Sequence, residues 1–206
     1  MKFRLPYKRK QLDYILSSCW YKEVITDPRQ TFAEAFLFMD IFGFRRLFKE
    51  VLRATLPGAS YTPNMIADLI CEFKIIESVI NAAYIINRDQ LKCSIETDSN
   101  ELSNNFVYYG EHYGSLEWDY FPRSLSRSEF MNPYLTFERF FEYRNLKQWK
   151  AYLLETMETA TVKEKGGRGL DLIEIYFQLT KLFEAACLVD IRENKHDHGM
   201  LKSSFS

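Results

Sequence analysis

Histidine transfers protons in more enzyme mechanisms than any other side chain, and this chain of 206 residues contains three: His112, His196 and His198. Glu111 directly precedes His112, and a neighbouring carboxylate can orient an imidazole as a general base, so both are candidate catalytic residues. His196 and His198 lie in a polar stretch near the C-terminus. An exposed tail explains that stretch more simply than a metal site does, and we predict no metal and no cofactor.

Arg192 and His198 are separated by five residues. This pair resembles the arginine–histidine motif of the HEPN family, helical-bundle proteins that include ribonucleases acting through that pair. The resemblance covers seven residues where the last helix is expected to end, and it implies catalytic roles for Arg192 and His198. A hydrolytic enzyme such as a helical-bundle ribonuclease, using either Arg192 with His198 or His112 with Glu111, is therefore an alternative function.

A connecting segment between positions 108 and 127 is rich in aromatic side chains and ends in two arginines. Its rings could fill a groove over the helical core as a structured crossover. They could equally form a contact surface, because Tyr and Trp bury much area and arginine offers forked donors to a carboxylate. The candidate binding residues are therefore Trp118, Tyr120, Arg123 and Arg127, and the expected partner is another protein.

An internal repeat indicates the elements that would position these residues. The hexapeptide at 27–32 (DPRQTF) matches 132–137 (NPYLTF) at an offset of 105 residues, and 68–73 (DLICEF) matches 171–176 (DLIEIY) at an offset of 103. Both blocks occur in the same order, which is typical of a duplicated unit. The chain therefore contains two diverged copies of one structural element.

Each copy is predicted to be a helical hairpin. Asp27 and Asn132 precede proline and are expected N-caps, because their side chains can accept from free amides of the first turn. One continuous helix should follow each cap until glycine- or proline-rich breakers at 56–60 and 165–169. The second helix of each copy has an apolar stripe with helical periodicity.

The predicted fold class is all-α: two tandem helical-hairpin repeats form a four-helix bundle-like core with approximate two-fold pseudosymmetry, as one domain. The expected segments are a basic N-terminal segment with a helix (1–26), the first repeat (27–88), a polar then aromatic crossover (89–131), the second repeat (132–193) and a flexible tail (194–206). Two pairs of polar residues occupy matched positions in the repeats, Asn81/Glu184 and Glu50/Glu155. The members of each pair could meet near the pseudo-axis as acid and base, or they could lie at the rim of the apolar stripe.

The composition narrows the classes of function. With 27 basic and 28 acidic side chains, the net charge of −1 creates no overall field toward nucleic acid or an anionic membrane. Nucleic-acid binding through residues 8–10 and the Arg45/Arg46 face remains an alternative that we do not favour. We expect that the chain has no membrane segment, that its cysteines are reduced and that its location is cytoplasmic.

The leading hypothesis is a non-enzymatic helical module that binds another macromolecule through the aromatic and arginine-bearing crossover.

Overall fold

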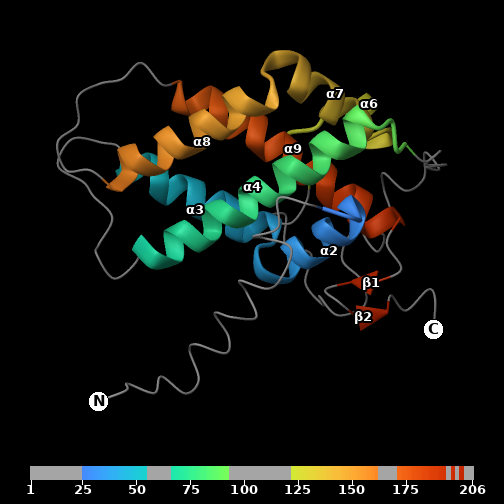
Figure 1. Ribbon diagram of the computed structural model, residues 1–206, viewed down its shortest axis with the longest axis horizontal. Coiled ribbons are helices and arrows are strands. Elements are labelled where there is room, and N and C mark those ends of the chain that lie inside the picture. Colours follow the sequence, from blue (N-terminus) through green and yellow to red (C-terminus); the bar gives the residue numbers. More distant parts are fainter. Residues whose placement is uncertain are drawn as a thin grey trace.

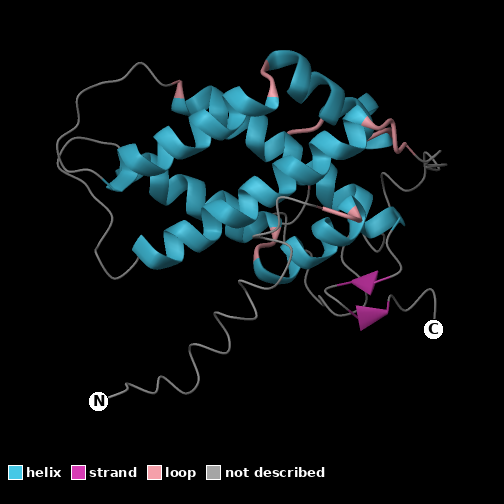
Figure 2. Ribbon diagram, in the orientation of Figure 1, coloured by secondary structure: helices cyan, strands magenta, loops and turns pink. Residues whose placement is uncertain are grey.

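The computed structural model describes residues 25–54, 66–92, 122–161, 171–193, 196–197 and 200–201. This part of the chain is mainly helical, which confirms the predicted fold class at that level (Figures 1 and 2). Its helices are α2 (Pro28–Phe38), α3 (Ile41–Ala54), α4 (Ile66–Arg88), α6 (Arg127–Met131), α7 (Tyr134–Tyr143), α8 (Leu146–Thr161) and α9 (Leu172–Glu193).

The predicted caps lie at the starts of α2 and α7. The Asp27 side chain accepts from the amides of Arg29 and Gln30, at 2.9 and 3.2 Å, and Pro28 is the first helical residue. The Asn132 side chain accepts from the amide of Tyr134 at 3.2 Å, but the N-cap of α7 is Pro133, so the prediction of Asn132 as the N-cap is wrong by one residue. Both side chains therefore satisfy amides that a first helical turn leaves without intrahelical partners.

The long first helix predicted for each repeat is divided in two. Met39 is extended after α2, and the Asp40 side chain accepts from the Gly43 amide at 2.6 Å, which caps the separate helix α3. In the second half, Asn145 accepts from the Gln148 amide at 3.0 Å at the start of α8. The prediction of one continuous helix is therefore wrong at both places, because a capping side chain offers the backbone an alternative to helix continuation.

The two longest helices, α4 and α9, organise the packing (Figure 1). Both α2 and α7 pack against α4 and α9, whereas α3 packs on α9 and α8, and α8 packs on α4 and α3. Stacked rings fill the interior, with the Phe44 and Phe183 centroids 4.0 Å apart and those of Phe140 and Trp149 4.1 Å apart. The apolar faces of helices distant in sequence thus form one core.

Several predicted segments lie outside the described residues, namely the N-terminal helix and the crossover from 93 to 121. The end of the crossover forms α6, a helix that the sequence analysis did not predict. Four residues of the predicted tail form a short antiparallel ladder of β1 (His196–Asp197) and β2 (Met200–Leu201), again without an indication in the sequence analysis. None of the described helices is long and apolar enough to cross a membrane.

Candidate binding site

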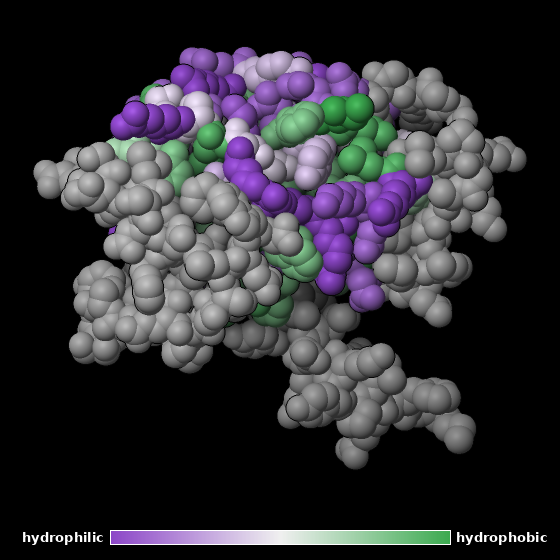
Figure 3. Space-filling view, turned by 180° about the vertical axis from the view of Figure 1, so that it is seen from behind, coloured by the Kyte–Doolittle hydropathy of each residue, from purple (hydrophilic) through white to green (hydrophobic). Residues whose placement is uncertain are grey.

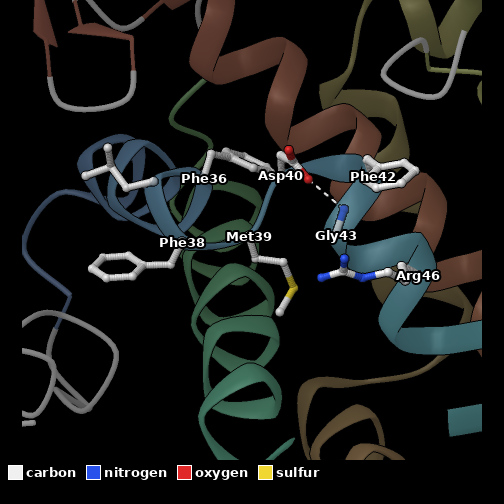
Figure 4. A pocket seen from close by; sticks show the side chains of 8 residues that line it. Phe36, Phe38, Met39, Asp40, Phe42, Gly43 and Arg46 are labelled. Atoms are coloured by element: carbon white, nitrogen blue, oxygen red, sulfur yellow. Dashed lines mark hydrogen bonds between the residues drawn. The ribbon is translucent and has the colours of Figure 1, made fainter. Parts of the chain in front are cut away.

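An open pocket of about 500 Å³ lies at the elbow between α2 and α3. Figure 4 shows it from close by, with Phe38 and Phe42 on opposite sides and Arg46 extending from α3 toward Met39. Its lining consists of Phe36, Leu37, Phe38, Met39, Asp40, Phe42, Gly43 and Arg46. This volume lies within the range of about 300–1,000 Å³ that is usual for ligand pockets.

The lining combines buried and exposed apolar side chains. Phe36 and Met39 are buried at 4% exposure, whereas Leu37 is 43%, Phe38 49% and Phe42 38% exposed. Apolar side chains also gather beside hydrophilic ones on the face seen in Figure 3, so the surface of the helical part is not uniformly polar. Three large exposed side chains around one pocket form a contiguous feature, unlike isolated surface residues that need no explanation.

The charges at the pocket are not equivalent. The Asp40 carboxylate is engaged by the Gly43 amide. Arg46 is exposed and forms no ion pair with any described residue, although its charge acts on Glu72. Burial, Glu50 and Asp68 raise the pKa of Glu72, and Arg46 opposes that shift. The guanidinium of Arg46 is therefore the group at the pocket with donors to offer.

The elbow between α7 and α8 has a different surface. The Arg144 guanidinium carbon lies 4.6, 5.5 and 4.3 Å from the ring centroids of Tyr143, Trp149 and Tyr152. Cation–π contacts of this kind stabilise a buried or half-buried arginine. At this elbow the Arg144 side chain therefore packs on aromatic rings.

Positions that match the pocket carry other residues in the second half. At the offset of 105, Leu37 corresponds to Glu142, Phe42 to Lys147 and Arg46 to Ala151. A helix–elbow–helix element of this kind therefore forms with charged or small residues at these three positions. Sequence analysis missed the pocket because it compared the two halves only where their residues are similar, and the halves differ at these positions.

A buried ion pair joins α3 to α9. Arg45, 5% exposed, pairs through Nη2 with Oε1 of the fully buried Glu184. The Ser124 amide donates to Glu184 Oε2 at 2.8 Å, and its hydroxyl lies 3.3 Å from Oε1. Arg45 is therefore not on an exposed basic face, and the expected Arg45/Arg46 surface is reduced to Arg46. Glu184 also does not lie on the rim of its helix.

The other matched polar positions have separate surroundings. Glu50 and Glu155 are both half-buried, and the carboxylate that Glu50 perturbs is that of Glu72. Asn81 is half-buried on α4. Glu184 has Arg45 and Ser124 as its partners. Glu184 and Glu50 therefore interact with groups other than Asn81 and Glu155, the matched residues considered from the sequence.

A polar cluster lies where α2 and α7 begin and α9 ends. Glu193 accepts from Arg29 Nε at 2.6 Å and from the Tyr134 hydroxyl at 2.5 and 2.6 Å. Arg29 Nη2 also lies 3.1 Å from the Tyr134 hydroxyl and donates to the Leu91 carbonyl at 2.5 Å. Burial and the bond to Glu193 raise the pKa of Tyr134, while Arg29 acts in the opposite direction.

A second carboxylate, Glu129, belongs to a capping box in α6. The Ser126 amide donates to Glu129 Oε2 at 2.8 Å, Arg139 Nη1 donates to Oε1 at 2.8 Å, and Lys181 Nζ lies 3.3 Å from Oε2. Burial alone would raise the pKa of Glu129, but the bonds from Ser126 and Arg139, with the charge of Lys181, lower it to about 2. Glu129 is therefore ionised at neutral pH and ties α6 to α7 and α9.

The residues proposed from the sequence are only partly described. Arg123 and Arg127 are exposed before and at the start of α6. The candidates Glu111, His112, Trp118, Tyr120 and His198 lie outside the described residues. In the described part, no three His, Cys, Asp or Glu side chains are grouped so that they could hold a metal ion.

Arg192 lies in the last turn of α9. Its Nη1 donates to the Phe130 carbonyl at 2.7 Å, and its guanidinium carbon lies 4.8 Å from the Phe130 ring centroid. The Nε and Nη2 atoms are buried and have no hydrogen-bond partner in the part of the chain that the structure describes. The structure thus provides two uncommitted donors at the arginine that resembles the HEPN motif.

Comparison with known proteins finds no family model that matches this chain, no curated protein of similar sequence and no solved structure of similar fold. In the part of the chain that it describes, the structure defines a mainly helical protein with an open pocket at the α2–α3 elbow.

Proposed function

We propose that this chain is a non-enzymatic helical module that binds another protein, with the α2–α3 pocket as part of its contact surface. The observation that carries the proposal is the exposure of Leu37, Phe38 and Phe42 around one pocket. Exposed apolar area that surrounds a concavity is typical of binding sites. Cys71 and Cys187 form no disulfide with any described residue, which is compatible with a reducing location such as the cytoplasm.

The proposal includes an approximate two-fold relation between the halves 25–92 and 122–193. Its support is the shared helix order and the reciprocal packing, in which α3 lies on α9 and α8 on α4. Matched residues also meet: Arg29 Nη2 lies 3.1 Å from the Tyr134 hydroxyl, and the Phe32 and Phe137 centroids are 5.9 Å apart. Under this relation the α7–α8 elbow is the equivalent of the α2–α3 elbow, so its residues show what an elbow of the same kind can contain.

Comparison of the two elbows indicates which residues of the α2–α3 elbow are available for binding. Since α7 and α8 form their elbow with Glu142 at the position matched to Leu37, an elbow of this kind can form without an apolar side chain there. An exposed apolar side chain without a folding role is a liability unless a partner covers it. The aromatic and arginine-bearing crossover, with Trp118, Tyr120, Arg123 and Arg127, is proposed as a second part of the contact surface.

Partner capture with a transplanted surface tests the function. Leu37→Glu/Phe42→Lys installs the residues of the second elbow, and Ile173→Glu/Phe177→Lys is the matched control at side chains that are 65% and 52% exposed on α9. Each tagged protein is used to capture partners from native cell extract. We expect the wild type and the control to retain a partner that the elbow variant loses. Identical partner sets for all three proteins would refute the role of the pocket.

A hydrolytic function is the second candidate, because Arg192 keeps two buried donors without partners in the described part. An arginine of this kind could neutralise the phosphate of a nucleic acid during cleavage. Incubation of purified wild type and Arg192→Lys with single-stranded RNA tests it. Cleavage by the wild type alone would support a nuclease, and intact RNA with both proteins would exclude this activity on that substrate.

A further inference from the structure

We infer that Arg144, at the elbow between α7 and α8, is a binding site for a dianionic phosphate group. The site is separate from the α2–α3 pocket, and the inference does not depend on the proposed function. The phosphate belongs either to a small phosphorylated molecule or to a phosphorylated side chain of a partner protein, since both present the same group.

The guanidinium of Arg144 is held in place by aromatic rings. Its carbon lies 4.6, 5.5 and 4.3 Å from the ring centroids of Tyr143, Trp149 and Tyr152. Trp149 is buried, and Arg144 itself is half-buried. A long side chain loses rotamer freedom when it binds a ligand, so a guanidinium that is already fixed binds at a lower entropic cost.

The guanidinium has a donor edge that is open to a ligand. Nη1 is buried without a hydrogen-bond partner, whereas Nε and Nη2 are accessible and form no hydrogen bond with a described residue. Nε and Nη2 lie on one edge of the planar group, which suits two oxygens of one oxyanion. Arg88 shows this arrangement in the same chain, because its Nε and Nη2 donate to the two carboxylate oxygens of Asp89 at 2.5 and 2.7 Å.

The charges around Arg144 favour a dianion. The run 143–154, which contains the elbow and the first half of α8, has three basic residues and no acidic one. Lys150 pairs with Glu77 at 3.3 Å, whereas Lys147 is exposed and forms no ion pair with a described residue. Two positive charges without partners thus lie on one short stretch of chain. A phosphate group carries nearly two negative charges at neutral pH and has three strong acceptor oxygens.

The fold does not explain the arginine. At the offset of 105 the matched residue is Met39, which is 4% exposed, so an elbow of this kind can form without a cation there. The acids that flank the run in sequence, Glu142 and Glu155, form no ion pair with Arg144. Arg144 is therefore a half-buried charge that no described carboxylate pairs, although charges removed from water are usually paired. A phosphate ligand would supply the partner.

Phosphate titration followed by NMR tests the inference. The isotopically labelled full chain is titrated with inorganic phosphate at constant ionic strength, so that the screening of surface charges does not change. Arg88 is the internal reference, because Asp89 already occupies the equivalent edge. We expect the side-chain Nε–H signal of Arg144 to shift and saturate at millimolar phosphate while that of Arg88 stays in place. No shift, a shift that does not saturate, or equal shifts of both signals would overturn the inference.

Two lysine variants assign these signals and measure the contribution of the arginine. Arg144→Lys keeps the positive charge and removes the paired donors, and Arg88→Lys is the matched control; thermal melting establishes that both are folded. Followed on the backbone amides of the elbow, Arg144→Lys should raise the dissociation constant for phosphate about fivefold or more, and Arg88→Lys should leave it unchanged. Equal affinities of Arg144→Lys and the wild type would contradict the assignment. If Arg144→Lys does not fold, the wild-type titration decides alone.

Two further titrations of the wild type define the ligand. Acetate, which presents two oxygens but a single charge, should bind more weakly than phosphate, and equal affinity would refute a phosphate site. A blocked phosphoserine peptide that binds more tightly than inorganic phosphate would support a phosphorylated side chain as the ligand. A peptide that binds no more tightly than inorganic phosphate would support a small phosphorylated molecule.

Discussion

Replacing Arg45 by methionine should destabilise the fold strongly. Arg45 is 5% exposed and Glu184 is fully buried, so the substitution leaves a carboxylate in the core with Ser124 as its remaining described partner. Removing one member of a buried ion pair typically costs about 3–5 kcal/mol. For a chain of this length, about 1 kcal/mol corresponds to about 2–4 °C in the melting temperature. We therefore expect Tm to fall by roughly 6–20 °C.

A double-mutant cycle shows whether the pair causes this loss. Glu184→Gln retains an acceptor for the Ser124 amide but removes the charge, so Arg45→Met/Glu184→Gln should be more stable than Arg45→Met alone. Urea unfolding followed by circular dichroism gives the four free energies of unfolding. Arg46→Met is the matched control at an exposed neighbour and should change stability by less than about 0.5 kcal/mol. Additive losses in the cycle, or an Arg45→Met loss below about 1 kcal/mol, would refute the reasoning.

Three further changes test other contacts by equilibrium unfolding. Asp40→Ala should cost about 1 kcal/mol by removing the cap of α3, whereas Asp40→Asn should cost much less; equal losses would contradict the capping role. Since the pKa of Glu129 falls from 4.5 to about 2 on folding, wild-type stability should decrease as pH falls from about 5 to 2. Glu129→Gln should flatten that profile, and an unchanged slope would contradict it. Tyr134→Phe should cost about 1.5–3 kcal/mol by removing a donor to Glu193, and a neutral substitution would contradict this. Because folding raises the pKa of Tyr134, wild-type stability should also decrease above about pH 10, and Tyr134→Phe should reduce that decrease.

The start of α2 and the helices α4 and α9 could be predicted because their signals are local. Asp27 before Pro28 marks the start of α2, and the apolar stripes of α4 and α9 have helical spacing. The break at Met39 and Asp40 could not be predicted in the same way. Phe36 and Phe44 are buried on opposite sides of the break, and their spacing suits one continuous helix equally well. Only tertiary packing decides between the two conformations, because each satisfies the local backbone.

The candidate site was harder to predict because its chemistry depends on distant residues. Arg45 and Arg46 look alike in the sequence, yet Arg45 is neutralised by Glu184, 139 residues away, and Arg46 lines the pocket. The exposure of Leu37 likewise depends on where α2 ends and how α3 turns away from it. Periodicity within a segment contains no information about either relation.

Arg45 and Arg46, which are adjacent in α3, are expected to have different roles, one in stability and one in binding. Arg45 holds α3 on α9, so its replacement should lower stability, and any change in binding should follow from unfolding. Arg46 lines the pocket at an exposed position, so its replacement should weaken binding of the partner protein without lowering stability. If Arg46 variants instead lose stability and binding together, the elbow is a structural element and the pocket is a consequence of packing. If they lose binding alone, the binding role of the pocket does not depend on its contribution to the fold.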